Sequence, residues 1–506
     1  MSASTGIEIE RKYDVEEAAA LPDLVGVTPA VAAVEDEGVR ELVTVYLDTA
    51  DFALARRGVV LRRRTGGPDA GWHVKTSGDG RGRVEHRLPL DDAGASADAE
   101  LGAPPAELLD PLRGLARGRA VEAIATLAVQ RRALLLRDAD GGLLAEVVDD
   151  HVTATPRHGE PSSWREWEVE LAPGSEDDAL LDAVEERVLA AGASVSGSVA
   201  KVARALGAAV PASRQGASAA LGAKARLDRF AAGGVGALVA RLVAHDESVR
   251  RGETDAVHQL RTTARRLRSL LGAVAPAYDA ESVDALRDGL RDLGRALSGA
   301  RDAEVLRERL TAAVAEEPEG PAVEHLLRLA ADREETTREA AVAALDGDEY
   351  FALLDALEAL TPRDDVEHPR AKEALRERMR REHRRVRRAA VRYDDAPGPA
   401  SSREALHDAR KAAKRLRYVV EAARELPGFG ASGHARRAEA VQDLLGEHLD
   451  ALTAAAAIAE AVPLAAQLEP AGVFSLGRAH AQEERRAADA LDAGLLALWE
   501  LFDREP

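Results

Sequence analysis

Acidic side chains alternate along two short segments that lie far apart in the sequence. Glu8, Glu10 and Lys12 occupy every second position near the start, and Glu168 and Glu170 repeat the acidic pattern much later. Residues two apart in a β-strand point to the same side, so each segment would carry two carboxylates on one face. Two such charges repel each other unless a cation lies between them. Oxygen ligands of this kind suit a hard divalent cation such as Mg²⁺ or Mn²⁺.

Further acids extend this set, and basic side chains alternate along neighbouring segments. The additional acids are Glu146, Asp149, Asp150 and Glu166, and the basic positions are Arg62, Arg64, Lys75, Arg83, Arg87, Arg131, Arg132, Lys201 and Arg204. If the strands close into a barrel with both sets inward, acids line one side of the lumen and bases the other. A dry core does not tolerate so many charges, whereas a wet tunnel holding a metal ion and a polyphosphate does. The alternative is that each pair lies on an ordinary solvent-exposed face.

The segments that carry these residues have the alternation and the Gly/Pro boundaries of strands. They are residues 7–12, 43–47, 59–64, 72–76, 84–90, 133–137, 143–148 and 165–171. Helical patterns intrude near 105–117 and 177–191. Many strands with few helices predict an antiparallel barrel or an α+β domain over 5–205. Small and polar residues at 206–222 predict a linker, and 223–506 is predicted to be all-helical.

Taken in order, the motifs of the first region resemble those of the CYTH domain, the triphosphate tunnel metalloenzyme family. The matching segments are Glu8-Ile-Glu10-Arg-Lys12, Tyr46-Leu-Asp48-Thr49, Leu61-Arg62-Arg-Arg64, Val74-Lys75, Arg83-x-Glu85 and Glu168-Val-Glu170. The resemblance implies an eight-stranded antiparallel tunnel with flanking helices. It also implies hydrolysis of triphosphates with Mg²⁺ or Mn²⁺ as the cofactor. We expect an inorganic triphosphatase, because the acidic and basic sets are intact and no pocket for a base or thiazole ring can be located in the sequence.

The resemblance assigns roles to individual positions. It implies metal ligands at Glu8, Glu10, Asp150, Glu168 and Glu170, with Asp149 as the competitor of Asp150. It implies triphosphate contacts at Lys12, Arg62, Arg64, Lys75, Arg131 and Lys201, with Arg132 as the competitor of Arg131. Arg87 departs from the family pattern, because many members carry an acidic or neutral residue there.

Two segments of the second region carry one basic helical pattern. His258, Arg261, Arg265 and Arg268 fall within a sector of about 80° on a helix, and the pattern recurs 149 residues later at His407, Arg410, Lys414 and Arg417. The segments 298–302 and 446–450 match at a similar distance. This repeat predicts two pseudo-symmetric helical bundles, about 223–362 and 363–506.

Stripes of like charge destabilise an isolated helix, so their repetition favours a surface or channel for an extended polyanion. Few aromatic residues lie near the stripes, which favours a chain of phosphates over nucleic acid. The basic run 370–392 is more typical of a solvated face with ion pairs to the abundant Glu and Asp residues, and an extension of this surface is the alternative.

The stripes resemble the CHAD domain, a helical domain often found behind CYTH. The matching motif, His-x-x-Arg followed by a basic cluster and Leu-Arg, occurs in both halves. The resemblance implies binding of inorganic polyphosphate. The implied contacts are His258, Arg261, Arg265, Arg266, Arg268, His407, Arg410, Lys411, Lys414, Arg415 and Arg417.

Composition limits the other possibilities. The 506 residues include no cysteine, which excludes disulfides, zinc–thiolate sites and cysteine nucleophiles. No apolar leader and no apolar run of about 18 residues is present, so we expect a cytoplasmic protein, with polyphosphate granules as a further location. The net charge of −20 makes nucleic acid an unexpected partner. Two alternatives stay open: a non-catalytic polyphosphate-binding or granule-targeting protein, and an organic triphosphatase or adenylyl cyclase of the tunnel family.

Overall fold

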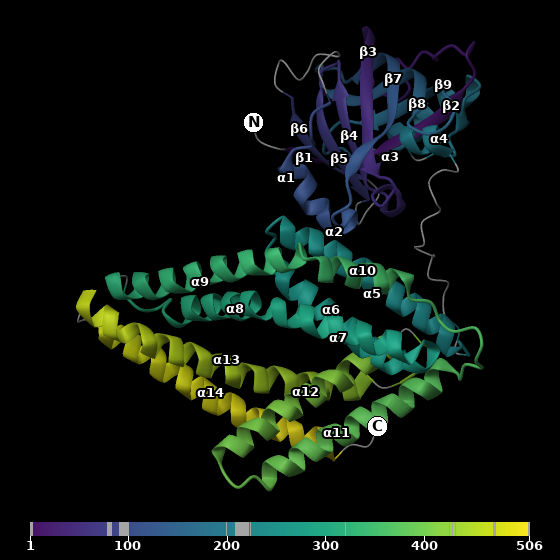
Figure 1. The fold of residues 1–506 in the computed structure, drawn as a ribbon. Helices are drawn as coiled ribbons and strands as arrows, with labels where there is room; N and C mark the ends of the chain where they lie inside the picture. Colours follow the sequence, from purple (N-terminus) through teal and green to yellow (C-terminus); the bar gives the residue numbers. More distant parts are fainter. Residues whose placement is uncertain are drawn as a thin grey trace. The chain divides into compact units, whose positions relative to one another are not determined.

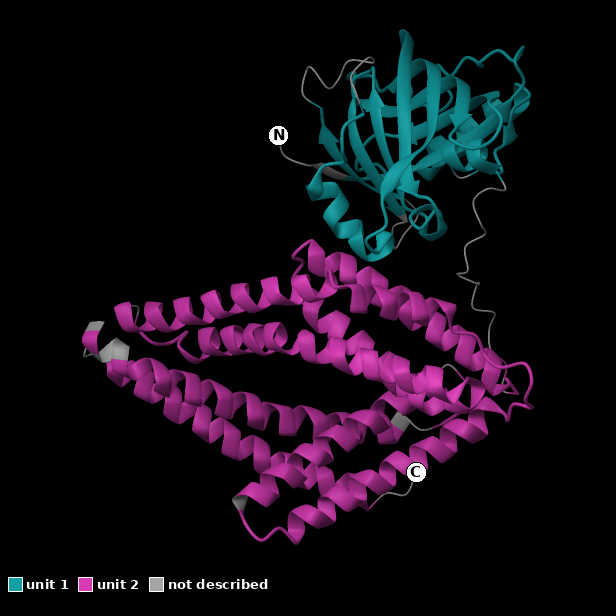
Figure 2. Ribbon diagram, viewed as in Figure 1, with its two compact units in different colours: residues 1–214 teal, residues 215–506 magenta. Residues whose placement is uncertain are grey.

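The chain divides into two compact units, residues 1–214 and 215–506, in the computed structural model (Figures 1 and 2). The structure describes residues 4–77, 83–90, 101–198, 200–207, 222, 224–318, 320–424, 426–427, 429–430, 432–468 and 472–503. Most of the predicted linker, 206–222, lies outside these residues. The limits predicted for the two domains therefore stay a prediction.

One antiparallel sheet forms most of the first unit. Its strands are β1 (Ser4–Glu8), β2 (Glu10–Val15), β3 (Ala33–Thr49), β4 (Val60–Thr65), β5 (Gly71–Ser77), β6 (Arg83–Pro89), β7 (Val121–Arg137), β8 (Leu143–Pro156), β9 (Ser162–Leu171) and β10 (Ser194–Val195). Short helices accompany them: η1 (Ala55–Arg57), α1 (Ala106–Leu109), η2 (Asp110–Leu112), α2 (Arg113–Ala116), α3 (Asp178–Ala190) and α4 (Lys201–Leu206).

The order of the strands explains why the sheet curls. It is β1-β6-β5-β4-β3-β7-β8-β9-β2-β10, so β1 lies at one end and β2 next to the other end. Only Ile9 separates these two strands in the chain, so the covalent chain itself joins the two ends of the sheet. The predicted count of eight strands is wrong. The first predicted strand breaks at Ile9 to pair with β6 on one side and β9 on the other, and β10 adds a tenth strand.

Helix α3 determines which side chains of β9 point into the curl. Trp167 and Val169 are fully buried in one core with Tyr13 of β2 and Leu181 and Val184 of α3. Because side chains alternate along a strand, the glutamates between these residues must point to the opposite face, away from α3. The short helix α4 buries its Val202 and Leu206 among residues of β3, β7 and β8 in a separate apolar cluster.

The second unit is all-helical among its described residues. Its helices are α5 (Leu227–Arg250), α6 (Ala256–Val274), η4 (Ala275–Ala277), α7 (Ala280–Ala296), α8 (Ser298–Ala313), α9 (Pro321–Leu345), α10 (Asp348–Ala359), α11 (Ala371–Asp394), α12 (Pro399–Ala423), α13 (Ser432–Leu468) and α14 (Gly472–Phe502). Figure 1 draws α5–α10 as one group and α11–α14 as another. No described helix is long and apolar enough to span a membrane.

The starts of the two groups lie side by side. Leu227 N donates to Pro369 O and Ala371 N donates to Ala225 O, both at 3.0 Å, so α5 and α11 begin as neighbours. Both basic stripes lie on helices, α6 and α12, and these two helices contact each other. The pseudo-symmetry of the halves stays a prediction.

Candidate functional site

A cavity of about 250 Å³ lies inside the curled sheet of the first unit. Among the described residues of this unit, nine basic and seven acidic side chains line the cavity. The basic ones are Lys12, Arg40, Arg62, Arg64, Lys75, Arg83, Arg87, Arg131 and Lys201, and the acidic ones are Glu8, Glu10, Asp69, Glu85, Glu146, Glu168 and Glu170. Every predicted site residue of this unit belongs to the lining except Asp150.

A row of carboxylates crosses three neighbouring strands of this cavity. In the register of the sheet, Glu170 on β9 lies opposite Glu10 on β2 and opposite Glu146 on β8. Neither Glu146 nor Glu170 forms an ion pair among the described residues. Burial, followed by the nearby Glu8 carboxylate, raises the pKa of Glu170 to about 7. Burial also raises the pKa of Glu146. This row therefore carries more negative charge than its surroundings neutralise.

Arginines of β4 face the cavity with incomplete pairing. Arg62 donates to Glu85 at 3.3 Å, and Arg64 donates to Asp69 at 2.5 Å. The Arg62 Nε is buried without a hydrogen-bond partner. Burial, followed by the charge of Arg62, lowers the pKa of Arg64. A buried, unpaired guanidinium donor of this kind is suited to an anionic oxygen.

Two lysines connect the acidic and basic sides. Lys12 Nζ lies 2.8 Å from Glu10 Oε2 and also pairs with Glu168. Lys75 pairs with Glu8 and lies 3.5 Å from Glu85. Each lysine therefore partly neutralises one carboxylate of the Glu8–Glu10 segment.

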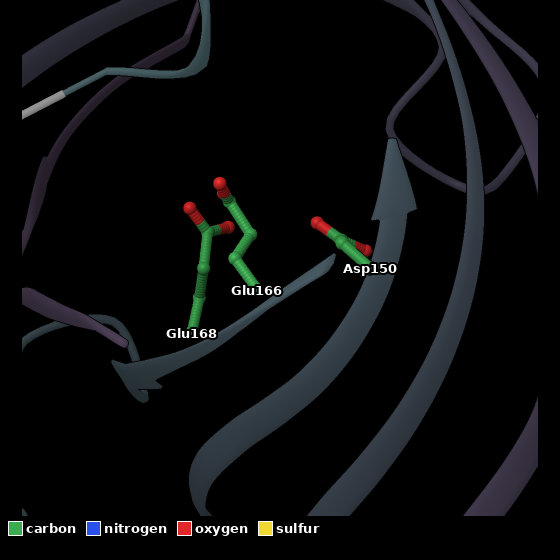
Figure 3. Close-up of side chains that lie close together, drawn as sticks. All are labelled: Asp150, Glu166 and Glu168. Atoms are coloured by element: carbon green, nitrogen blue, oxygen red, sulfur yellow. The ribbon is translucent and has the colours of Figure 1, made fainter. Parts of the chain in front are cut away.

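A second acidic group lies deeper, on β8 and β9. Asp150, Glu166 and Glu168 point towards one another, and one ligand atom of each lies within 4.8 Å of the others (Figure 3). The Lys201 ammonium contacts all three, at 2.9, 2.6 and 2.8 Å. These carboxylates raise the pKa of Lys201 although burial opposes the shift. An ammonium group thus already supplies positive charge to this group.

The structure shows which residue of each adjacent pair, Asp149 or Asp150 and Arg131 or Arg132, lies on the cavity side of the sheet. Asp150 is 0% exposed and receives a bidentate pair of hydrogen bonds from Arg131, at 2.8 and 2.6 Å. Asp149 points the other way and pairs with Arg165 at 2.7 Å. Arg132 also points away and pairs with Asp36 at 2.6 Å. Arg131 and Asp150 are therefore the members on the cavity side.

Hard oxygen donors in both acidic groups match what Mg²⁺ or Mn²⁺ binds. The two groups differ in the charge already present. A metal ion at Asp150, Glu166 and Glu168 would have to displace Lys201, whereas the row of Glu10, Glu146 and Glu170 holds a surplus of negative charge. The row, with Glu8 beside it, fits a divalent cation better.

A second cavity, of about 570 Å³, lies within the helical unit. Of the part of this unit that the structure describes, eleven lysines and arginines, two histidines and two acids line this cavity. They are Arg261, Arg265, Arg268, Arg287, Arg301, Arg378, Arg385, Arg410, Lys411, Lys414 and Arg415, with His258, His407, Asp302 and Asp450. Both predicted stripes therefore face one space, which we call the central cavity.

Cations in the central cavity outnumber their counter-charges. Burial, followed by the charge of Arg265, lowers the pKa of Lys414 to about 7. Burial, followed by Arg261, lowers the pKa of Arg265 to about 10. Burial also lowers the pKa values of His258 and His407. The described lining therefore contains too few acidic side chains to neutralise its basic ones, which favours the binding of anions.

Two predicted members of the stripes do not line this cavity. Arg266 lies 3.5 Å from Glu421, and Arg417 pairs with the same Glu421 at 3.0 Å and with Glu439 at 2.9 Å. Both side chains form ion pairs beside the central cavity, although each belongs to a basic motif.

Comparisons with known proteins match the two units to two different domain families. The CYTH domain family matches residues 6–206, and the CHAD domain family matches residues 234–459. The Mycobacterium tuberculosis protein MT2285 (strain CDC 1551 / Oshkosh) is 35% identical over 515 residues, which cover 97% of this chain and 96% of that protein. This chain belongs to the CYTH–CHAD family.

Two solved structures resemble part of the CYTH–CHAD chain. PptA from Streptomyces chartreusis is 20% identical with a TM-score of 0.43, covering 55% of this chain and all of that one. The CHAD domain from the plant Ricinus communis is 23% identical with a TM-score of 0.41, covering 55% of this chain and 95% of that one.

The CYTH and CHAD cavities also contain residues that were not among the predicted site residues. In the CYTH unit Arg40 and Asp69 are new, whereas Glu85, Glu146 and Glu166 were noted among the charged positions of the sequence without an assigned role. Glu146 and Asp150 are four residues apart in a strand and share a face, in keeping with the acidic set that the sequence analysis named. In the CHAD unit Arg287 is new, whereas Arg301 lies in the repeated segment 298–302 and Arg378 and Arg385 lie in the basic run 370–392. No local pattern singles out Arg287, because only the packing of α7 brings it to the cavity.

Proposed function

We propose that the CYTH unit hydrolyses inorganic triphosphate with Mg²⁺ or Mn²⁺ and that the CHAD unit binds inorganic polyphosphate. The first part of the proposal rests on the lining of the CYTH cavity. There a row of carboxylates that is not fully neutralised faces arginines with unpaired guanidinium donors. Members of the CYTH family are triphosphatases and cyclases, and CYTH tunnel enzymes depend on a metal ion.

Glu8, Glu10, Glu146 and Glu170 are the residues that would hold the metal ion. When bound, such an ion supplies Lewis-acid stabilisation of charge on phosphoryl oxygens. The carboxylates must be ionised to bind it, so the raised pKa of Glu170 implies that metal binding releases a proton.

Arg62, Arg64 and Arg131 are suited to bind the terminal and bridging oxygens of a triphosphate. Their guanidinium groups present fork-shaped donors that match phosphate oxygens. Glu85, Asp69 and Asp150 hold these arginines in place through the ion pairs described above. Fixed donors need little rearrangement as charge develops on the phosphoryl group, which is the main protein contribution to phosphoryl transfer.

The lining favours an inorganic substrate over a nucleotide or thiamine triphosphate. Among the described residues that line the CYTH cavity, Tyr46 is the only aromatic one. An organic triphosphate needs an apolar or stacking surface for its base or thiazole ring. The described lining consists almost wholly of charged side chains, which suit phosphates alone.

The central cavity carries the second part of the proposal. Its eleven lysines and arginines face only two acids, so a polyanion needs no bridging metal ion there. Inorganic polyphosphate matches this charge and requires no aromatic platform. Association with polyphosphate granules would follow from the same binding.

Phosphate release from tripolyphosphate tests the enzymatic part. We would measure it with Mg²⁺ or Mn²⁺ for the wild type, for Glu10→Gln in the carboxylate row, and for the matched control Glu35→Gln on an exposed stretch of β3. The expected result is a loss of at least about 100-fold for Glu10→Gln and little change for the control. ATP and thiamine triphosphate in the same assay compare the substrate classes.

Other outcomes would redirect the proposal. Wild-type protein that releases no phosphate but binds polyphosphate would favour the non-catalytic alternative. Preferred cleavage of ATP or thiamine triphosphate would favour the organic one. Equal loss of activity in Glu10→Gln and Glu35→Gln would show that the carboxylate row has no special role.

A further inference from the structure

The CHAD unit contains another basic cavity, of about 660 Å³, between α11, α12 and the end of α14. We call it the lateral cavity. Its charged lining consists of Arg385, Arg387, Arg388, Arg392, Arg415 and one acid, Asp408. None of the predicted polyphosphate contacts except Arg415 belongs to it, so the motif of the CHAD domain does not account for it.

A stripe of five arginines along α11 connects the two cavities of the CHAD unit. Arginine occupies positions 378, 381, 385, 388 and 392, a spacing of three and four residues that keeps side chains on one face of a helix. Arg378 lines the central cavity, Arg385 lines both cavities, and Arg388 and Arg392 line the lateral one, whereas Arg381 lines neither. The stripe extends for about 21 Å, at ~1.5 Å per residue.

The shared edge of the two cavities is built around one buried carboxylate. Glu382 is 0% exposed and contacts Arg378 at 2.8 Å, Arg385 at 2.9 Å and Arg415 at 3.2 Å. One negative charge cannot neutralise three guanidinium groups, so positive charge remains on both sides of the edge. The carboxylate therefore holds Arg385 and Arg415 in place and leaves them able to bind an anion.

Helix α12 presents a different face to each cavity. His407, Lys411 and Lys414 line the central cavity, whereas Asp408 and Ala412 line the lateral one. Arg415 lies at the boundary and lines both. Arg385 on α11 and Arg415 on α12 therefore place positive charge at the boundary between the two cavities.

Phe502, the aromatic residue in the described lining of the lateral cavity, is half-buried and already packs against other side chains. The guanidinium of Arg387 lies over the Phe502 ring, 4.7 Å from its centroid. Trp499 packs against the same ring in an edge arrangement at 5.0 Å. A nucleobase would need a free aromatic face to stack on. The lateral cavity thus favours a ligand made of phosphates over single-stranded nucleic acid.

We propose that the lateral cavity is a second polyphosphate subsite, which binds the part of a long chain that extends out of the central cavity along the α11 arginines. This inference rests on the proposed binding of polyphosphate in the central cavity. It predicts selectivity for length: long chains engage both cavities, and short chains need only one.

The experiment compares long-chain inorganic polyphosphate with tripolyphosphate on the full-length protein, with a chelator present to stop hydrolysis. The test variant is Arg388→Glu with Arg392→Glu. The matched control is Arg376→Glu with Arg380→Glu, which makes the same change of charge at the same spacing on α11 but lines neither cavity. Direct binding is measured for both probes at several salt concentrations.

We expect the test variant to lose about tenfold to hundredfold in affinity for the long chain relative to the control, because two charge-assisted contacts are removed. Its affinity for tripolyphosphate should match the control. The salt dependence of long-chain binding should also become shallower, because fewer phosphates are neutralised.

The results separate this inference from the proposed function. Equal long-chain affinity in the test and control variants would overturn the second subsite while leaving polyphosphate binding intact. Wild-type protein that binds neither probe would overturn the proposed function of the CHAD unit. A single-stranded RNA probe whose binding depends on Arg388 and Arg392, while polyphosphate binding does not, would assign the cavity to nucleic acid and overturn the inference.

A variant that is expected to bind long-chain polyphosphate more tightly tests whether weaker binding by the Arg388/Arg392 variant results from misfolding. Asp408 pairs with Arg392 at 2.6 Å and so competes with a phosphate for it. Asp408→Asn should therefore strengthen long-chain binding roughly threefold and leave tripolyphosphate binding unchanged. Weaker binding of the long chain by Asp408→Asn would contradict the proposed subsite.

Discussion

The cavities of the CYTH unit and of the CHAD unit are both lined by charged residues, but their charge balance differs. In the CYTH unit nine bases face seven acids, whereas in the central CHAD cavity eleven lysines and arginines face two acids. A balanced lining can bind a metal ion and a phosphate chain together, because each part of the ligand meets its opposite charge. A cationic lining binds the chain directly. The comparison teaches that the two proposed phosphate sites should differ in their need for metal, because their charge balance differs.

Metal removal gives the largest expected contrast between the two units. Treatment with a chelator should abolish triphosphate hydrolysis, by at least about 1,000-fold, because the charge stabilisation of phosphoryl transfer is lost. Binding of long-chain polyphosphate should change less than about twofold. Phosphate release and direct binding measured on one sample check both parts. Polyphosphate binding that needs Mg²⁺ would break the comparison.

Loss of a lysine from the balanced CYTH cavity should destabilise the protein. Lys201→Met leaves Asp150, Glu166 and Glu168 buried without their shared ammonium, at an expected loss of about 3 kcal/mol in the free energy of unfolding. Tryptophan fluorescence reports this transition, because three of the four tryptophans lie in the CYTH unit. Adding Glu166→Gln should restore part of the stability. An unchanged melting temperature would argue against the observed ion pairs.

Charge reversal in the central cavity should separate the two activities. Arg261→Glu with Arg410→Glu should weaken long-chain polyphosphate binding by about 100-fold, because repulsion replaces two charge-assisted contacts. Triphosphate hydrolysis should stay within about twofold of the wild type, because both residues lie in the CHAD unit. A large loss of hydrolysis in this variant would show that the two cavities do not act independently.

Polyphosphate binding should weaken as the pH rises through neutrality. Lys414 has a pKa of about 7, below its usual value, and a bound polyanion favours its protonated form. Affinity should therefore fall about tenfold between pH 6 and pH 8. Lys414→Arg, which stays charged, should remove this fall, and titrations at constant ionic strength measure it. A steep fall that persists in Lys414→Arg would assign the titration to other groups.

The smallest expected effect is a gain in stability when one cation is removed from the central cavity. A lysine whose pKa is lowered in the folded state destabilises that state fully below pH 7, and this penalty disappears as the pH rises towards 10. Lys414→Met should therefore raise the melting temperature of the ligand-free protein by about 2–4 °C at pH 7. Circular dichroism of the helices measures this temperature. The same change should weaken polyphosphate binding, opposite in sign to its effect on stability.

Much of the CYTH cavity could be predicted from local alternation. Glu8, Glu10 and Lys12 share a face because side chains alternate along a strand, and Arg62 and Arg64 do so for the same reason. The helical repeat likewise placed His258, Arg261 and Arg265 on one side of α6. These relations involve neighbours in the chain, so the regular geometry of strand or helix suffices to predict them.

Other features depended on contacts between distant segments. The break at Ile9, which gave ten strands instead of eight, arises because one segment pairs with both β6 and β9. Only Leu297 separates α7 from α8, and neither proline nor glycine occupies this break. Arg266 and Arg417 fit the basic motif but pair with Glu421 beside the cavity.

The amino-acid sequence alone thus specified which kinds of charge lie together on each strand and helix, because that follows from the periodicity of the backbone. Tertiary structure alone decided which charges meet across elements: Asp150 and not Asp149 joins Arg131 and Lys201, and Arg287 reaches a cavity built by other helices. The physical reason is that pairing between strands and packing between helices depend on burial over the whole unit, which no local pattern contains.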